Sequence, residues 1–429
     1  MSASPYDINS PAYKKALRLH KKSKKTPAAD DLPQLREQEK AFKARFPPPS
    51  LSDVLDLSWK ESDFGNLWKG VSSIDGLEEI PCQDGKVAYT IASAPGFVLL
   101  PGYLSPLEQR ERIRATLENH AKPPNENNLD THYNLPVEGL FPAWKVFTKQ
   151  RAIDPRSSEP IIETKAPTGH TAELAPKRAL IDNTAASTEN FEDIQAMEKL
   201  PAPPSTSLSP LPLSSILYKL RWSNIGHFYH WGTKSYQFDR ELISIPSDIK
   251  SICQRAVQTV PWSKVWKNGA DLAAGEWESG PDWQQWHKNY DPDAGIINFY
   301  QLKDTLMAHV DRSELSSTSP LVSISLGQSA VFLLGGLTRD EKAIPVILRS
   351  GDVLIMSGPR CRRAFHGVPR ILEDSLPNHL KSKGEVEEDW DLIADYLGTT
   401  RININMRQVF PPNFPYEQYG LSHLQNKFY

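Results

Sequence analysis

The chain has 429 residues, of which 49 are Lys or Arg and 52 are Asp or Glu, so its formal net charge at pH 7 is -3. No apolar run approaches the roughly 18 residues that a membrane-spanning helix needs, which excludes a transmembrane protein. The near-neutral charge gives no global sign of nucleic-acid binding, although it does not exclude a local basic patch. Cys82, Cys253 and Cys361 lie too far apart for a zinc knuckle or a disulfide framework, which indicates a reducing compartment.

Residues 1–50 are predicted to be a disordered basic tail, because they hold few apolar residues and a run of cations between Lys14 and Lys25. Such a run is typical of a nuclear-import signal or a nucleic-acid-binding arm, and a merely solvated tail explains it equally well. The start of the chain lacks the apolar stretch of a secretory signal, and Asp7 fits a transit peptide poorly. We therefore expect the nucleus or cytoplasm, with the mitochondrion as an alternative.

Residues 51–150 are expected to be a mostly helical start of the catalytic region, and residues 151–214 a disordered insertion that explains much of the excess of 36 prolines over 23 glycines. Ser105 followed by Pro106, with Glu108 three residues after Ser105, predicts the start of a helix. Residues 215–290 are expected to be a helical, nucleotide-recognition region. Its helix at 247–260 carries Cys253 on the apolar face, so this cysteine belongs to the core.

Short apolar or alternating runs begin at Ala294 and are separated by Gly, Ser, Pro or Asp, which is typical of strands. Their close spacing indicates a sandwich or barrel in residues 291–429 and not a sheet with helical crossovers. The chain has no Gly-x-Gly-x-x-Gly after a strand, which argues against a nucleotide-cofactor fold. The runs are 295–300, 306–310, 321–326, 330–334, 346–348, 353–356 and 402–409.

The pair His309 and Asp311 would point to one side of a strand, because side chains alternate with period two. With the distal His366, these residues make the two-histidine, one-carboxylate set of a non-haem Fe(II) oxygenase. The His-x-Asp pair alone is a weak signal, and an exposed ion pair explains it as well.

The second signal is Arg401, Asn403, Asn405 and Arg407, which would share one face of a strand. Two inward arginines are costly unless an anion pairs with them, and a dicarboxylate fits their planar forks. A solvent-facing polar edge is the alternative, but the nearby metal-ligand set favours the ligand. Asn298 and Tyr300 would share a face and could hydrogen-bond the same carboxylates.

These motifs follow one another in a fixed order: Asn298-x-Tyr300, His309-x-Asp311, His366 in His-Gly-Val-Pro-Arg, and Arg401-x-Asn403-x-x-x-Arg407. The order resembles the AlkB family of Fe(II)/2-oxoglutarate dioxygenases. Residues 123–129 and 220–231 further resemble its eukaryotic AlkB homologue 1 branch. The resemblance runs from Phe97 to Phe410, without the proline-rich insertion.

The resemblance implies an α+β fold with a double-stranded β-helix (jelly-roll) core, flanking helices and the long disordered insertion. It implies His309, Asp311 and His366 as Fe(II) ligands, and Arg401 and Arg407 as the residues that hold 2-oxoglutarate. By the same resemblance Asn298, Tyr300 and Asn403 are polar partners of 2-oxoglutarate. The implied enzyme is a monomer that uses molecular oxygen to demethylate N-alkylated bases of tRNA or DNA, as in DNA repair, and releases formaldehyde, succinate and carbon dioxide.

Two groups of residues are predicted to contact a single-stranded or flipped base: cations around His366 that would position phosphates, and aromatic residues upstream that could stack on a base. These are Arg360, Arg362, Arg363 and Arg370, and Trp222, Phe228, Tyr229 and Trp231. The arginines can equally pair with acidic residues, and the rings can belong to the core. One departure from the family is the acidic stretch Glu373 to Asp395, which is expected to loop out on the surface.

Two alternatives stay open. The same fold serves enzymes that hydroxylate or demethylate protein side chains, so a methylated histone or another protein tail is an alternative substrate. A non-enzymatic interaction protein that acts through the basic tail is less favoured, because the three metal ligands and both arginines are all present.

Overall fold

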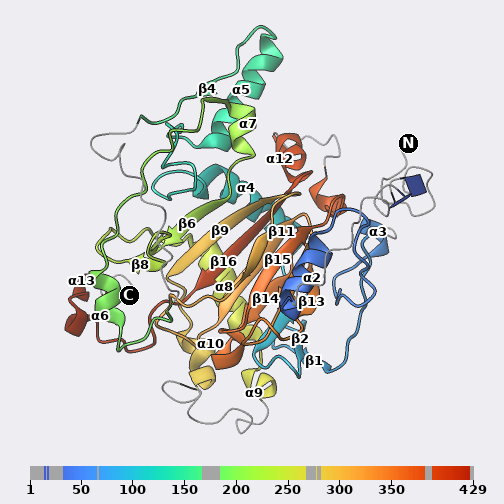
Figure 1. The fold of residues 1–429 in the computed structure, drawn as a ribbon, viewed down its shortest axis with the longest axis vertical. Helices are drawn as coiled ribbons and strands as arrows, with labels where there is room; N and C mark the ends of the chain where they lie inside the picture. Colours follow the sequence, from blue (N-terminus) through green and yellow to red (C-terminus); the bar gives the residue numbers. More distant parts are fainter. Residues whose placement is uncertain are drawn as a thin grey trace.

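The computed structural model describes residues 14–15, 17–18, 32–64, 67–166, 184–266, 277, 282–381 and 389–425. Two antiparallel β-sheets pack together, with helices around them (Figure 1). The larger sheet has the spatial order β1 (Leu77–Pro81), β2 (Val87–Ile91), β3 (Phe97–Leu100), β14 (Val353–Met356), β11 (Leu321–Gly327), β16 (Thr400–Arg407), β9 (Ala294–Gln301) and β6 (Trp222–Gly226). The smaller sheet has the order β10 (Leu306–His309), β15 (His366–Ile371), β12 (Ala330–Leu334) and β13 (Ile344–Leu348). This arrangement confirms the predicted α+β class and jelly-roll core.

Two short pairs of strands lie outside these sheets, β4 (Ile161–Ile162) with β5 (Leu211–Pro212), and β7 (Phe228–His230) with β8 (Ser235–Gln237). The helices are α2 (Gln34–Lys43), α3 (Glu61–Phe64), α4 (Pro106–Ala115), the π-helix η1 (Thr116–His120), α5 (Leu140–Ile153), α6 (Phe191–Ala196), α7 (Leu213–Leu217), α8 (Ser247–Thr259), α9 (Trp262–Val265), η4 (Asp282–Gln285), α10 (Trp286–Asn289), α11 (Gly358–Cys361), η5 (Asn378–Leu380), α12 (Trp390–Leu397), η6 (Tyr416–Tyr419) and α13 (Ser422–Gln425). Among the described residues, none of these helices is long and apolar enough to cross a membrane.

The alternation of side chains along β16 separates a polar inner face from an apolar core. Ile402, Ile404 and Met406 are buried in the same cluster as the apolar faces of α4, α8 and α12. Arg401 and Arg407 point to the opposite face, between the two sheets. The outer face of the larger sheet is thus sealed by helices, and its inner face is free to carry charged side chains.

Both helices predicted from the sequence are present. Helix α4 begins after Ser105, whose side chain accepts a hydrogen bond from the backbone N–H of Glu108, while the Glu108 carboxylate accepts one from the N–H of Ser105. Helix α8 buries Cys253 in the apolar cluster, and burial raises the pKa of its thiol, so this cysteine is a core residue as predicted.

Three strands, β1 to β3, lie in the stretch that the sequence predicted to be mostly helical. They extend the larger sheet beyond β14, because β3 pairs with β14 from Val353↔Leu100 to Met356↔Phe97. Strand β2 alternates in its burial pattern, and the turn before it contains Gly85 at φ 81°. These local signals of a hairpin were missed.

Parts of the two segments predicted to be disordered are packed. Helix α2 buries Leu35 and Phe42 and lies against the smaller sheet (Figure 1). In the proline-rich segment, Ile162 and Phe191 are buried, and Phe191 contacts Phe238 and Phe410. The predictions of disorder at residues 34–43, 161–162 and 191–196 are therefore wrong, while residues 167–183 and most of the basic run lie outside the described residues.

The acidic stretch is also partly packed. Helix α12 buries Trp390, Ile393 and Leu397 in the outer apolar cluster, and Asp389 pairs with Lys145 and Lys149 at 2.9 and 3.0 Å. The expectation of a surface loop is wrong for this part, and residues 382–388 lie outside the described residues.

A buried ion pair closes the β13 edge of the smaller sheet. The segment around Leu55 adds to this edge, where the N–H of Ile347 donates to the carbonyl of Leu55 at 2.7 Å. The next residue, Asp56, accepts from Nε and Nη2 of Arg349 at 2.8 and 2.7 Å, and the side chains of both are 1% exposed. The pair therefore protects an edge that would otherwise present unpaired backbone groups.

We expect Asp56→Ala to lower the free energy of unfolding by about 3–5 kcal/mol, because the Arg349 guanidinium would stay buried without its carboxylate. Chemical denaturation measures this loss. The control is Asp53→Ala at an exposed position nearby, which should change stability by less than about 0.5 kcal/mol. Equal losses in the two variants would contradict the role of the pair.

Candidate active site

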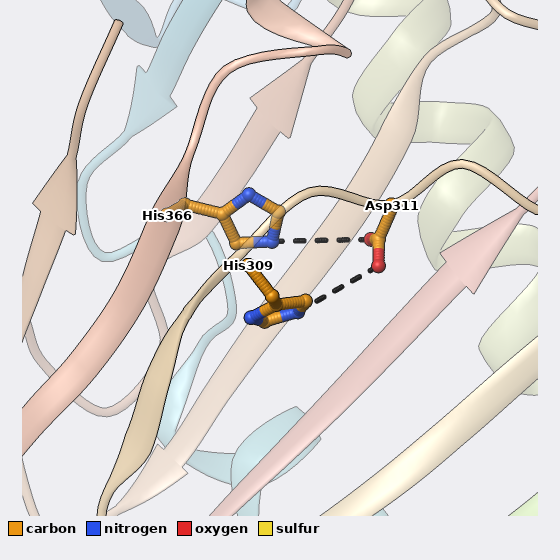
Figure 2. Close-up of side chains that lie close together, drawn as sticks. All are labelled: His309, Asp311 and His366. Atoms are coloured by element: carbon orange, nitrogen blue, oxygen red, sulfur yellow. Dashed lines mark ion pairs between the residues drawn. The ribbon is translucent and has the colours of Figure 1, made fainter. Parts of the chain in front are cut away.

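Three potential metal ligands meet where β10 and β15 run side by side. His309 ends β10 and lies opposite His366, the first residue of β15, with their ring centroids 4.5 Å apart. Asp311 follows β10 by two residues and faces both rings (Figure 2). Its carboxylate oxygens lie 3.7 Å from Nε2 of His309 and 3.9 Å from Nε2 of His366. One ligand atom from each residue lies within 4.8 Å of the others, so these residues could hold a metal ion.

Backbone contacts orient both imidazoles. Nδ1 of His309 lies 3.0 Å from the carbonyl of Met307, and Nδ1 of His366 lies 3.1 Å from the carbonyl of Ala364. Each carbonyl accepts a hydrogen bond from Nδ1–H, so Nε2 keeps its lone pair on the side of Asp311. Burial lowers the pKa of His366 to about 4, so that imidazole is neutral at pH 7. Neutral imidazoles beside a carboxylate are the donor set that suits divalent iron.

The charge of Asp311 is stabilised from the other sheet. Burial would by itself raise the pKa of this carboxyl, but the Arg407 guanidinium and the two imidazoles hold it below its usual range. Nη2 of Arg407 lies 3.1 Å from Oδ2 of Asp311, and Nη1 lies 3.6 Å from Oε1 of Glu314. Arg407 is thus held by two carboxylates, one of which belongs to the candidate metal site.

Arg401 has no such partner. It is 1% exposed and lies on β16 between Tyr300 of β9 and Gly327 of β11. Its Nη2 donates to Oγ of Ser325 at 3.0 Å, whereas Nε and Nη1 have no hydrogen-bond partner within the described part of the chain. Burial lowers the pKa of Arg401 to about 10, so it is still charged at pH 7. An enclosed cation with idle donors fits an anionic ligand such as the carboxylate of 2-oxoglutarate.

The other residues predicted to hold 2-oxoglutarate lie on the same face. The register places Asn298 beside Asn403 and Tyr300 beside Arg401. Nδ2 of Asn403 donates to Oγ of Ser323 at 2.7 Å, which fixes the amide against β11. Burial raises the pKa of Tyr300 to about 12, so its hydroxyl stays protonated and can donate to an anion.

Of the four arginines around His366 that were predicted to position phosphates, the structure buries two. Arg362 and Arg370 are buried, and they pair with Glu314 at 3.3 Å and with Glu373 at 3.1 Å. The prediction that they contact phosphate is therefore wrong. Arg363 is half-buried and donates to the backbone carbonyl of Asp311 at 3.0 Å, while Arg360 is exposed on α11.

The predicted aromatic residues gather at the β6 edge of the cleft. Trp222 lies 5.1 Å from Trp231, and Tyr229 lies 5.0 Å from Trp231, as distances between ring centroids. The hydroxyl of Tyr229 lies 3.3 Å from Oγ of Ser313, two residues after Asp311, which places the β7–β8 hairpin next to the metal-ligand cluster. Phe228 has another role, because its ring lies 4.1 Å from the Arg240 guanidinium.

Two buried carboxylates near the site carry no signal in the sequence pattern. Glu314 accepts from the Tyr236 hydroxyl at 2.8 Å and pairs with Arg362, so it ties the β7–β8 hairpin to the cleft. Glu39 of α2 accepts from the backbone N–H of Ala308 at 2.6 Å and pairs with Arg36 at 2.9 Å. Because β10 is an edge strand of the smaller sheet, this bond fixes the strand that presents His309.

Comparisons with known proteins agree with this geometry. Residues 174–407 match the 2OG-Fe(II) oxygenase superfamily. The chain is 31% identical over 380 residues to the DNA N(6)-methyladenine demethylase ALKBH1A of Arabidopsis thaliana, covering 87% of this chain and 92% of that protein. It is 29% identical over 425 residues to the nucleic acid dioxygenase ALKBH1 of Mus musculus, covering 95% and 86%. It is 27% identical over 379 residues to the tRNA demethylase abh1 of Schizosaccharomyces pombe, covering 88% and 95%.

We expect Glu39→Ala to weaken binding of a divalent metal about tenfold or more, because the residues that support metal ligands typically contribute that much to affinity. Titration calorimetry with Mn(II) on the full chain measures it. Glu37→Ala, at an exposed position of the same helix, is the matched control. If the two variants bound Mn(II) equally well, the hydrogen bond to Ala308 would have no part in the metal site.

Proposed function

The chain belongs to the AlkB homologue 1 branch of the 2OG-Fe(II) oxygenase superfamily, and from that membership we propose that it oxidatively demethylates N-alkylated bases of nucleic acid. In this proposal His309, Asp311 and His366 hold Fe(II), and Arg401 and Arg407 hold 2-oxoglutarate. One molecule each of oxygen, 2-oxoglutarate and N-methylated base gives succinate, carbon dioxide, formaldehyde and the demethylated base. We also propose that the enzyme acts as a monomer.

The proposal rests on the buried Arg401 guanidinium. Its Nε and Nη1 have no hydrogen-bond partner among the described residues, and it lies between the same two sheets as the three potential metal ligands. Bound Fe(II) and 2-oxoglutarate would supply the electrons that activate molecular oxygen, which is the oxidant of the otherwise inert C–H bond. The chain contributes the neutral imidazole of His366 and the ionised carboxylate of Asp311. It also contributes two cations on the inner face of β16, Arg401 near its start and Arg407 at its end. Arg407 keeps Asp311 ionised, and Arg401 gives a carboxylate a partner that water cannot reach.

A nucleic-acid substrate is supported by the aromatic edge of the cleft. Trp222, Tyr229 and Trp231 offer faces on which an extruded base can stack, and the exposed Arg360 and the half-buried Arg363 lie close to His366 in the chain as candidate contacts for phosphates. The relatives named above include a DNA demethylase and a tRNA demethylase, so both polymers are candidates. Action on DNA would be repair, and action on tRNA would be removal of a modification.

We expect Arg401→Gln to raise the KM for 2-oxoglutarate at least about 30-fold, since losing one partner of a buried charge pair costs about 2 kcal/mol or more. Steady-state assays of succinate formation measure this change. Lys303→Gln, at an exposed position in the loop after β9, should leave the KM unchanged. If 2-oxoglutarate affinity survived in Arg401→Gln, another residue would have to bind the co-substrate.

The substrate class is tested by incubating the protein with Fe(II), 2-oxoglutarate and three substrates: methylated tRNA, methylated DNA and methylated histone peptides. Mass spectrometry of each mark should show loss from nucleic acid and none from the peptides. His309→Ala should abolish that loss, because it removes a metal ligand. Turnover of peptides alone would favour the protein-demethylase alternative.

A further inference from the structure

Asn224 of β6 is a buried amide without a partner. It is 1% exposed, and neither its side-chain oxygen nor its nitrogen has a hydrogen-bond partner among the residues that the structure describes. Its backbone N–H is satisfied, since it donates to the carbonyl of Glu126 at 2.8 Å. A buried donor and acceptor that are both idle cost stability, so such a group calls for a ligand or a bound water molecule.

The register of the larger sheet places this amide on the inner face of the cleft. Asn224 lies opposite Ile296 of β9, and Ile296 lies opposite Asn405 of β16. Its neighbour Ile225 points the other way, into the outer apolar cluster. Asn224 therefore shares a face with Trp222, Arg401 and Arg407.

The spacing of the larger sheet sets the separation between Asn224 and the inner face of β16. Neighbouring strands lie about 4.8 Å apart, so β6 and β16 are separated by about 10 Å. Arg407, the next inward residue after Asn405, lies 3.1 Å from Asp311. A base that spans this gap would present its alkyl group near the metal ligands and its far edge near Asn224. Asn405 is a second polar group on this inner face, and its Oδ1 also has no hydrogen-bond partner among the described residues.

Aromatic rings flank the amide. Trp222 lies two residues before it on the same face and contacts Trp231 with the two rings tilted by 37°, and the β7–β8 hairpin follows it directly. Rings supply stacking for any base, whereas an amide with one donor and one acceptor can select among bases. This pairing of stacking and hydrogen-bonding groups has the composition of a site for an extruded base.

We propose that Asn224 is a specificity-determining residue whose side-chain amide hydrogen-bonds to the substrate base, an inference that rests on the proposed function. An asparagine amide matches the amino group and N7 of adenine, which leaves the N1 edge of that base free to face the metal ligands. Cytosine methylated at N3 has no free acceptor beside its amino group. Asn224 therefore favours an adenine methylated on its Watson–Crick edge.

The test compares Asn224→Leu with the wild-type protein on single-stranded oligonucleotides that carry one N1-methyladenine or one N3-methylcytosine. We expect kcat/KM on the methyladenine substrate to fall about tenfold or more, and to fall clearly less on methylcytosine. The KM for 2-oxoglutarate should not change. The Tm of the free protein should stay equal or rise, because the variant removes an unsatisfied buried amide. Asn289→Leu, at an exposed position of α10, is the control for the substitution itself.

Three outcomes would overturn the inference. Unchanged kcat/KM on methyladenine would show that the amide does not touch the base. An equal fall on both substrates together with a lower Tm would assign Asn224 to the fold, for instance through a bound water molecule. A wild-type protein that demethylates neither oligonucleotide would remove the proposed function itself, and the inference with it.

Discussion

The structure depends on the neutralisation of one buried cation. Arg407 comes from the larger sheet, and the two carboxylates that hold it, Asp311 and Glu314, follow β10 of the smaller sheet. A guanidinium in the interior is costly unless it is paired, so this contact fixes the two sheets against each other where the three potential metal ligands converge. It also keeps Asp311 ionised. Sheet packing and readiness for a metal therefore share one ion pair.

Most of the candidate site residues could be predicted because their pattern is local. Arg401, Asn403 and Arg407 repeat on one face of a single strand, so period-two geometry was enough to place them, whereas Asp311 lies two residues beyond the end of β10 and reaches the site from the segment that follows this strand. Glu39 and Asn224 could not be found in this way. The first matters because its partner Ala308 lies 269 positions away, and the second because it has no partner in the described chain. Neither property can be inferred from the neighbouring residues in the sequence.

The wrong predictions share a physical cause, which is that composition describes a segment and not its individual side chains. Residues such as Phe42, Phe191 and Trp390 anchor stretches whose average is polar, because one large apolar side chain buried in an existing cluster can hold several polar neighbours in place. The arginines around His366 show that the same holds for charge. Two of them are neutralised by Glu314 and Glu373, so their sign says little about partners in solution.

The N-terminal residues have a consequence for how this protein can be made or shortened. Helix α2 supports β10, the Leu55 segment completes the β13 edge, and β3 covers β14, so the described segments between Gln34 and Leu100 are built into sheets whose other strands, apart from β6, lie beyond residue 293. A fragment limited to residues 174–407, the span that matches the superfamily, would expose the edge of β14 and invite aggregation. During synthesis, α2, the Leu55 segment and β3 are made before the strands with which they pair. The strand that presents His309 is therefore supported by the N-terminal part of the chain, and a shortened variant that starts after α2 loses this support.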